Sequence, residues 1–205
     1  MKRTATALAL LTFSLLRAAP AAAQERPNVV SVTPLNGLLG LARFNVGDWG
    51  VHYERRLGDH LGVVVEATMV HVHGPPMHVW LFGGTVGARW HFLPTPSGPF
   101  VGVHAGYRTG FGRNATTVTV NGAARAVEEP SLTPSQLRVV ANVGYRWVHA
   151  SGLAVTGRLG AGWGPFTTTA GGASAESAQI AQNTNDALGF TSVAVDTELS
   201  VGYAF

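Results

Sequence analysis

The sequence of 205 residues has no cysteine, few charged side chains and no long apolar run beyond its first segment. Without cysteine, no disulfide can staple a small exported fold, so the chain must close on itself by other means. No apolar run after residue 23 approaches the roughly 20 residues that a membrane-spanning helix needs. Any passage of this chain through a membrane must therefore use strands.

The first 23 residues have the order of parts of a secretory signal peptide. Lys2 and Arg3 form a basic region, an apolar run extends from Ala5 to Leu16, and Ala21-Ala22-Ala23 offers an A-x-A cleavage site. This run is too short to serve as a helical anchor in a bilayer. We therefore expect an exported protein with a signal peptide at 1–23 and a mature chain at 24–205.

Removal of that segment changes the charge balance of the chain. The whole sequence has 14 basic and 11 acidic side chains, and Lys2, Arg3 and Arg17 would leave with the signal peptide. The mature chain would then have 11 of each and a net charge near zero. The balance therefore gives no support for nucleic acid as a partner, which would need a clustered basic face. We also expect no cofactor.

Beyond Pro27 the sequence is rich in Val, Gly, Thr and aromatic residues with period-two alternation, the pattern of β-strands. Short turn signals at 57–60, 93–99 and 149–152 contrast with the long polar segments Arg113–Pro134 and Pro165–Phe190. Outer-membrane barrels have short periplasmic turns, longer extracellular loops and an even number of strands. The sequence thus predicts an all-β fold, an eight-stranded antiparallel up-and-down transmembrane β-barrel. Its strands are expected at Val29–Leu41, Asp48–Arg56, Leu61–Val72, His78–Phe92, Phe100–Gly112, Ser135–Val148, Leu153–Gly164 and Thr191–Phe205.

The predicted strands separate aliphatic from polar residues by face, and aromatic residues lie at both ends of the aliphatic rows. Rows of this kind fit a lipid-facing band between two aromatic girdles at the headgroup level, whereas a soluble barrel such as a lipocalin would turn its apolar row inward. The extracellular girdle would contain Trp49, Trp80, Phe82, Phe111 and Trp163, and the periplasmic girdle Trp90, Phe92, Tyr145, Trp147, Tyr203 and Phe205.

The opposite face of the predicted strands carries most of the charge. Unpaired charges in a narrow barrel are costly, so we expect these groups to pair and to replace the missing apolar core. The alternative is a polar pore or a proton path. Arg158 and Glu198 lie on neighbouring strands and are our expected pair. The predicted interior charge network consists of Glu54, Glu66, Arg89, Arg108, Arg138, Arg146, Arg158, Asp196 and Glu198.

Eight strands, long outer loops and the ending Leu199-Ser200-Val201-Gly202-Tyr203-Ala204-Phe205 resemble the small OmpA- and OmpX-type outer-membrane barrels. The resemblance covers Val29 to Phe205. It implies a place in the bacterial outer membrane among outer-membrane lipid, and it implies that Phe205 is the signal for the barrel assembly machinery. Since the chain ends with the barrel, we expect no counterpart of the peptidoglycan-binding domain of full OmpA.

Two local histidine motifs are candidates for chemistry. His149-Ala150-Ser151 has the His-x-Ser spacing of outer-membrane lipid A deacylases, but it falls in a predicted periplasmic turn, away from that substrate. His71 and His73 share a strand face and His78 returns across a turn, so the three are weak candidates for a metal site. We favour the simpler interpretations, which are a polar turn for the first motif and solvated histidines for the second.

A third local feature is structural. Thr116–Val120, Asn121-Gly122 and Ala123–Val127 have the pattern of a β-hairpin with a two-residue type I′ turn. This hairpin would either prolong the neighbouring strands beyond the membrane or form a small separate unit.

Three functions fit these patterns. The first is a non-enzymatic integral outer-membrane barrel, structural or surface-interacting, with a charge-filled interior and an unknown surface ligand. The second is a narrow channel for small solutes, and the third is a lipid-modifying envelope enzyme. The sequence favours the first, because paired interior charges account for the polar face without an open path.

Overall fold

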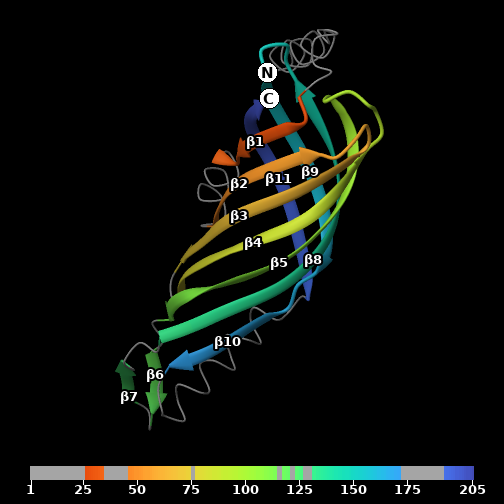
Figure 1. Cartoon of the computed structure of the whole chain (residues 1–205). Helices are drawn as coiled ribbons and strands as arrows, with labels where there is room; N and C mark the ends of the chain where they lie inside the picture. Colours follow the sequence, from red (N-terminus) through yellow and green to blue (C-terminus); the bar gives the residue numbers. More distant parts are fainter. Residues whose placement is uncertain are drawn as a thin grey trace, which may run out of the picture.

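The computed structural model describes residues 26–34, 46–74, 77–114, 117–120, 123–126, 131–171 and 192–205. In these ranges eight antiparallel strands close into a barrel, which confirms the predicted all-β fold (Figure 1). No described helix is long and apolar enough to span a bilayer. The predicted signal peptide at 1–23 lies outside the described residues. The barrel strands are β1 (Asn28–Val32), β2 (Val46–Arg56), β3 (Leu61–Gly74), β4 (Met77–His91), β5 (Gly98–Asn114), β8 (Ser131–Val148), β9 (Leu153–Trp163) and β11 (Val193–Ala204).

The strands neighbour one another around the barrel in chain order, and β11 pairs with both β9 and β1 to close it. A path straight across the ladders that starts at Tyr203 of β11 returns to that strand at Val193, ten residues earlier. This stagger, combined with ordinary strand spacing, tilts the strands by roughly 40° from the barrel axis. Eight strands at this tilt enclose a space that side chains can fill, so the contents of the barrel are its core.

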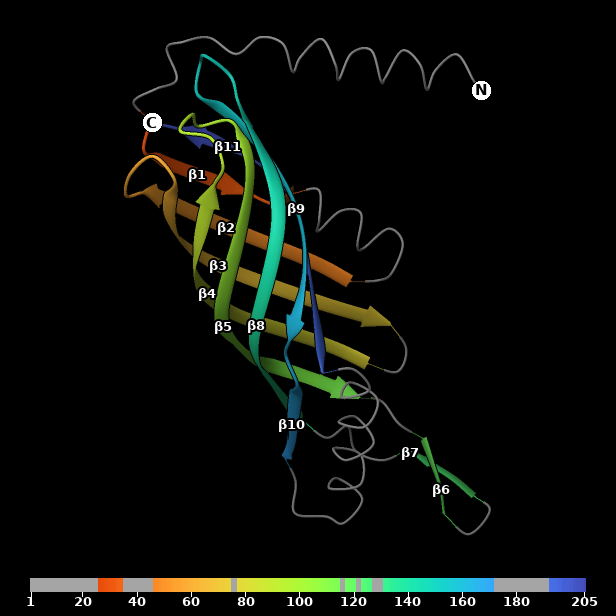
Figure 2. The ribbon, with the colours of Figure 1, turned by 90° about the vertical axis from the view of Figure 1, so that its right-hand side faces the viewer.

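The two ends of the barrel differ. Both termini of the barrel and the short turns 57–60, 92–97 and 149–152 lie at one end, which we call the terminal end. At the opposite end, the loop end, β5 and β8 extend furthest, together with the added strand β10 (Phe166–Gly171), as Figures 1 and 2 show. This end therefore carries a wall of sheet that is taller on one side than on the other.

Strand β10 corrects the predicted loop that began at Pro165. The chain breaks its ladder at Gly164-Pro165, because proline has no N–H to donate. It then resumes in the same register on β8: Trp163 faces Val139 and Phe166 faces Gln136. The proline interrupts the strand without ending it.

Two other predicted strand boundaries were also wrong. Strand β8 begins at Ser131 and runs through Pro134, not from Ser135. The pairing of β8 with β5 is interrupted at Pro134. Thr109 pairs with Ser135 before the interruption, and Gly112 pairs with Leu132 after it. Strand β1 ends at Val32, two residues before Pro34, and not at Leu41. At Pro134 and Pro165 a missing N–H interrupts one ladder while the strand direction continues, whereas β1 ends before Pro34 is reached.

The predicted hairpin between β5 and β8 is present as a small sheet of its own. Strand β6 (Thr117–Val120) pairs with β7 (Ala123–Ala126), with Val120 opposite Ala123. Asn121 and Gly122 lie outside the described residues. Of the two predicted alternatives, the separate unit is the one observed.

Close strand packing at one inner-wall glycine gives a test of the barrel. A Cβ at Gly162 would overlap the carbonyl oxygen of Val139 and lie 2.6 Å from Val140 Cα, whereas a Cβ at Gly157 of the same strand meets nothing within 4 Å. We expect Gly162→Ala to lower the free energy of unfolding by about 1–3 kcal/mol. Gly157→Ala should change it by less than about 0.5 kcal/mol. Urea unfolding of the refolded barrel measures both, and equal effects would contradict this packing.

Candidate functional site

The interior of the barrel is a network of charged side chains. All nine residues of the predicted interior charge network lie inside it, each at most 8% exposed. They come from every barrel strand except β1, because side chains alternate across a strand and each strand turns its polar row inward. The network therefore joins parts of the chain that are far apart in sequence.

Arg158 is the centre of this network. Its guanidinium contacts Glu66 through two nitrogens, one of them 3.1 Å from Oε2. Its Nε lies 2.9 Å from Asp196 Oδ2 and 2.9 Å from Glu198 Oε2. Glu198 is also the direct register partner of Arg158. One arginine thus connects three carboxylates from two strands. Glu198 is the partner that the sequence analysis expected for Arg158.

Glu54 organises a second cluster, nearer the terminal end. Arg146 donates to both of its oxygens, at 3.0 and 2.6 Å, and Arg89 Nη1 donates to Oε2 at 2.9 Å. His91 Nε2 lies 2.7 Å from the other oxygen. Arg89 also reaches Glu198 at 3.4 Å, so the two clusters form one continuous network. Bidentate pairs of this kind fix geometry as well as charge.

Towards the loop end the network becomes looser. Arg138 Nη2 lies 3.3 Å from Asp196 Oδ1, and Arg108 Nε donates to Thr68 Oγ1 at 3.1 Å. Asp48, which shares the inward parity of His52, is close enough to Arg108 and Arg138 to interact with their charges. Counting Asp48, five inner carboxylates balance five arginines.

Sequence reasoning missed some members of the interior, among them Asp48 and Phe100. Asp48 was overlooked although its even number on β2 gives it the parity of His52 and Glu54. Phe100 is 1% exposed, and the Arg89 guanidinium carbon lies 4.7 Å from the centre of its ring. An aromatic residue of inward parity at the start of a predicted strand was the signal for Phe100.

Apolar side chains close the interior at both ends. At the terminal end, Val29, Val148, Ala154 and Ala204 form a buried cluster. At the loop end a second cluster contains Val70, Val79 and Leu81, packed against Val72 and Phe166. Phe166 joins it because β10 keeps the register of β9 past the proline. The charged middle of the barrel therefore has a buried apolar cluster on each side of it.

A buried trio of possible metal ligands lies within the network. Nδ1 of His52 is 3.1 Å from Glu66 Oε1 and 3.8 Å from Glu198 Oε2, and no other such trio occurs in the described part of the chain. Arg158 already contacts the same two carboxylate oxygens. A metal cation there would face a guanidinium at contact distance, so these residues do not fit a metal.

The three histidines predicted as weak metal candidates gather on the outer face at the loop end. The rings of His73 and His78 meet edge to face at 4.3 Å, and His71 stacks on Trp80 at 3.9 Å. His71, His73 and His78 do not bring three ring nitrogens within 4.8 Å of one another. The arrangement is therefore a row of stacked rings and lacks the convergent nitrogens of a metal site.

His149 and Ser151 are in contact at the terminal end. His149 Nδ1 lies 2.9 Å from Ser151 Oγ, and the same nitrogen accepts the backbone N–H of Ser151 at 3.2 Å. Both side chains are exposed in the turn, and Trp147, 5.7 Å away between ring centres, is the ring that flanks His149. No described carboxylate hydrogen-bonds the imidazole, so the third member of a nucleophilic triad is absent from the described residues.

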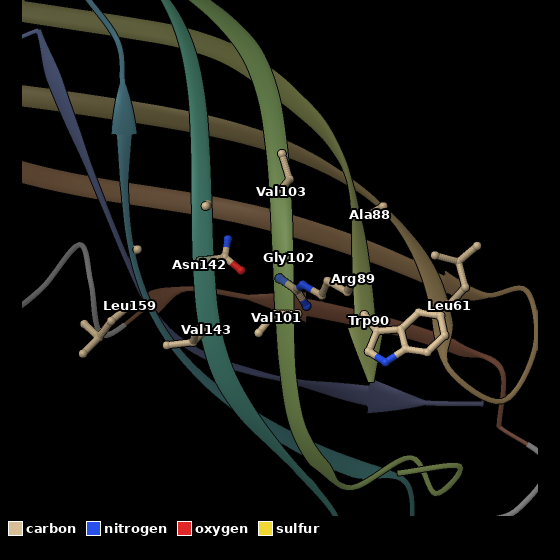
Figure 3. A pocket seen from close by; sticks show the side chains of 12 residues that line it. Leu61, Ala88, Arg89, Trp90, Val101, Gly102, Val103, Asn142, Val143 and Leu159 are labelled. Carbon is tan, nitrogen blue, oxygen red and sulfur yellow. The ribbon is translucent and has the colours of Figure 1, made fainter. Parts of the chain in front are cut away.

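The outer wall carries an apolar hollow of about 620 Å³ over β4, β5, β8 and β9 (Figure 3). Small residues such as Ala88 and Ala141 line it between Trp90 and Leu159, which are about half and two-thirds exposed. Arg89 belongs to the same stretch of wall but is buried behind it. The wall is thus apolar outside and charged inside.

Comparisons with known proteins do not show a family for this chain. No family model matches the chain, and no curated protein is similar to it in sequence. Among solved structures, the chain is similar to CarO2 of Acinetobacter baumannii, with 6% identity and a TM-score of 0.42, covering 87% of this chain and 97% of that one. What this barrel does must therefore be inferred from its own residues.

The central position of Arg158 gives the second prediction. Arg158→Ala would leave Glu66, Asp196 and Glu198 without their shared partner, and we expect a loss of about 3–5 kcal/mol in the free energy of unfolding. The matched control is Arg55→Ala, which removes an exposed arginine from the outer face of β2. It should change stability by less than about 0.5 kcal/mol.

The same variant tests whether the interior is sealed. Arg158→Ala should lower the urea midpoint without raising conductance in planar bilayers, because the apolar clusters at both ends remain. A stable Arg158→Ala barrel that passes markedly more current than the unmodified protein would show that the charges line a path.

Proposed function

We propose that the protein is a small integral outer-membrane barrel of the OmpA/OmpX type, structural or surface-interacting, with a closed interior. The observation that carries this proposal is the inverted placement of side chains: charged residues are buried and aliphatic residues are exposed. In water this arrangement would be unfavourable twice: large apolar areas would be exposed to solvent, and the charged side chains would lose their hydration. In a bilayer it places each group in a favourable environment.

The outer face supports a lipid environment around the whole barrel. Leu159 of β9 and Val195 of β11 are 66% and 69% exposed. On the outward positions of the described barrel strands, Arg55 and Arg113 are the residues with a formal charge, and they lie at opposite ends. The aromatic residues predicted for the two girdles occupy outward positions between those ends. A charge-free belt with aromatic borders matches the hydrocarbon core of a membrane.

The seam between β1 and β11 supports a role of Phe205 in assembly. Asn28 and Phe205 exchange backbone hydrogen bonds of 3.0 and 2.9 Å, which close the barrel at the terminal end. The Phe205 side chain is about half exposed. We propose that it is the residue that the barrel assembly machinery binds before this seam forms, with the terminal end on the periplasmic side.

The paired interior charges support this proposal over a solute channel. A channel needs a continuous polar path, whereas most of the charges here contact one another and a buried apolar cluster lies at each end. The enzyme hypothesis rests on the His149–Ser151 contact, but that pair lies in the turn opposite the loop end. We therefore propose no catalytic step for this chain.

Cell fractionation and electrophoresis test the location. The expressed protein should fractionate with outer membranes and should show a heat-modifiable mobility on gels, since a closed barrel resists detergent unfolding until heated. Reconstituted protein should give no steady conductance. Recovery in the soluble periplasmic fraction would refute the membrane proposal, and steady single-channel currents would refute the closed interior.

The lipid-facing belt gives the third prediction. Val143 on the outer face of β8 is 59% exposed and Leu57 in a terminal-end turn is 61% exposed, so exposure alone does not separate them. If the belt meets lipid, Val143→Arg should reduce stability in vesicles by about 2–4 kcal/mol, and Leu57→Arg by at most about 1 kcal/mol. Urea unfolding from lipid vesicles measures the difference, and equal tolerance would exclude a lipid-facing belt.

A further inference from the structure

A row of basic side chains crosses the outer face of the barrel at its loop end. His73 of β3 is the register partner of His78 of β4, and His78 is the register partner of Arg113 of β5. All three side chains are exposed and have the outward parity of their strands. Three neighbouring strands thus present basic groups side by side, and we call His73, His78 and Arg113 the basic row.

An aromatic row lies directly below the basic row. His71 is paired with Trp80, and Trp80 with Phe111, one outward position closer to the middle of the barrel. His71 stacks on the Trp80 indole with an angle of 9° between the rings. His71 and His73 rings are 5.7 Å apart, so the two rows touch. The basic row stands about 5 Å further along the axis than the aromatic row, given two residues of a tilted strand.

Within the described residues, the basic row has no acidic partner. No outward position of the described barrel strands carries Asp or Glu, and Arg113 makes no ion pair with a described residue. The arginines inside the barrel differ from Arg113 in this respect, since Arg89, Arg146 and Arg158 each contact carboxylates. An arginine on the outer wall that pairs with no described carboxylate is available for an external anion.

We propose that the basic row binds the phosphate-bearing headgroup of an outer-leaflet lipid. The proposal rests on the proposed function, because it requires the loop end to lie in the outer leaflet. The aromatic row then marks the headgroup boundary, and the basic row reaches the layer where lipid phosphates lie. Arg113 supplies a permanent charge with bidentate geometry, and the two histidines supply N–H donors beside it.

The direction of the row favours a lipid over a soluble anion or a protein. The three side chains leave the barrel wall sideways, on the same face as the aliphatic belt, so a bound molecule would also meet the aromatic row beneath. A lipid satisfies both parts of this surface, with phosphate at the basic row and acyl chains along the belt below. A free phosphate would use the charges alone.

Native mass spectrometry of the delipidated, refolded barrel tests the site. The probes are lipid A with its phosphates, the same lipid A with its phosphates removed, and inorganic phosphate as a competitor, all in a buffer with a metal chelator. We expect the intact barrel to retain phosphorylated lipid A about tenfold better than the dephosphorylated form, the effect of one charge-assisted contact. Inorganic phosphate should not displace it.

The variants separate this site from general binding of lipid. His73→Ala/His78→Ala/Arg113→Ala should abolish the preference for phosphorylated lipid A, and Arg113→Glu should abolish it alone. Arg55→Ala, an exposed outward arginine at the other end of the barrel, should retain it. Heat-modifiable mobility verifies that each variant is folded.

Three results would overturn the proposal. They are equal retention of both forms of lipid A, an unchanged preference in Arg113→Glu, and displacement of the lipid by inorganic phosphate. A barrel that inserts into vesicles but shows no phosphate preference refutes this site and leaves the membrane proposal intact. A chain that does not insert at all refutes both.

Discussion

The pairing of buried arginines with buried carboxylates is the constraint on which this barrel depends. An isolated charge in a low-dielectric interior costs several kcal/mol, and only good geometry with further hydrogen bonds offsets that penalty. Arg158 meets the condition with partners from β3 and β11, and Glu54 meets it with partners from β4 and β8. Because no single hairpin contains a complete set, the charges are neutralised only when the barrel closes. Closure without disulfides thus follows from the chemistry of the interior.

The same alternation that fills the interior determines the exterior. A strand that turns Glu198 inward must turn Leu199 outward, so the residues on either side of each interior charge belong to the outer wall. The result is a wall that water would not stabilise. Glycines such as Gly162 leave space on the inner side for long side chains and for close strand packing. Interior charge, outer belt and inner-wall glycines are therefore three consequences of one residue pattern.

The sequence predicts which face of a strand each side chain occupies, because the alternation of side chains is a local property. It does not predict most contacts between side chains of different strands. Glu54 lies 35 positions from Arg89 and 92 from Arg146, and their meeting depends on a stagger that accumulates around the whole barrel. The prolines misled the sequence analysis for a related reason: a missing N–H weakens one ladder locally, whereas pairing on both sides decides whether a strand continues. Val70, Val79 and Leu81 are apolar residues with the inward parity of their strands. Only the closed fold shows them as one apolar layer.

The paired charges of the interior also limit where a function of this protein can be. Side chains committed to mutual ion pairs cannot bind a solute without breaking a pair, and each broken pair leaves a buried charge. The outer surface has no such constraint. On the described strands, the formally charged outward residues are Arg55 beside Tyr53 and Arg113 beside Phe111, at opposite borders of the belt. Arg113 is paired with His78, which is paired in turn with His73, whereas Arg55 is paired across the ladders with Asn28 and Val63. This asymmetry between two otherwise similar arginines singles out the loop end as the surface where recognition is to be sought.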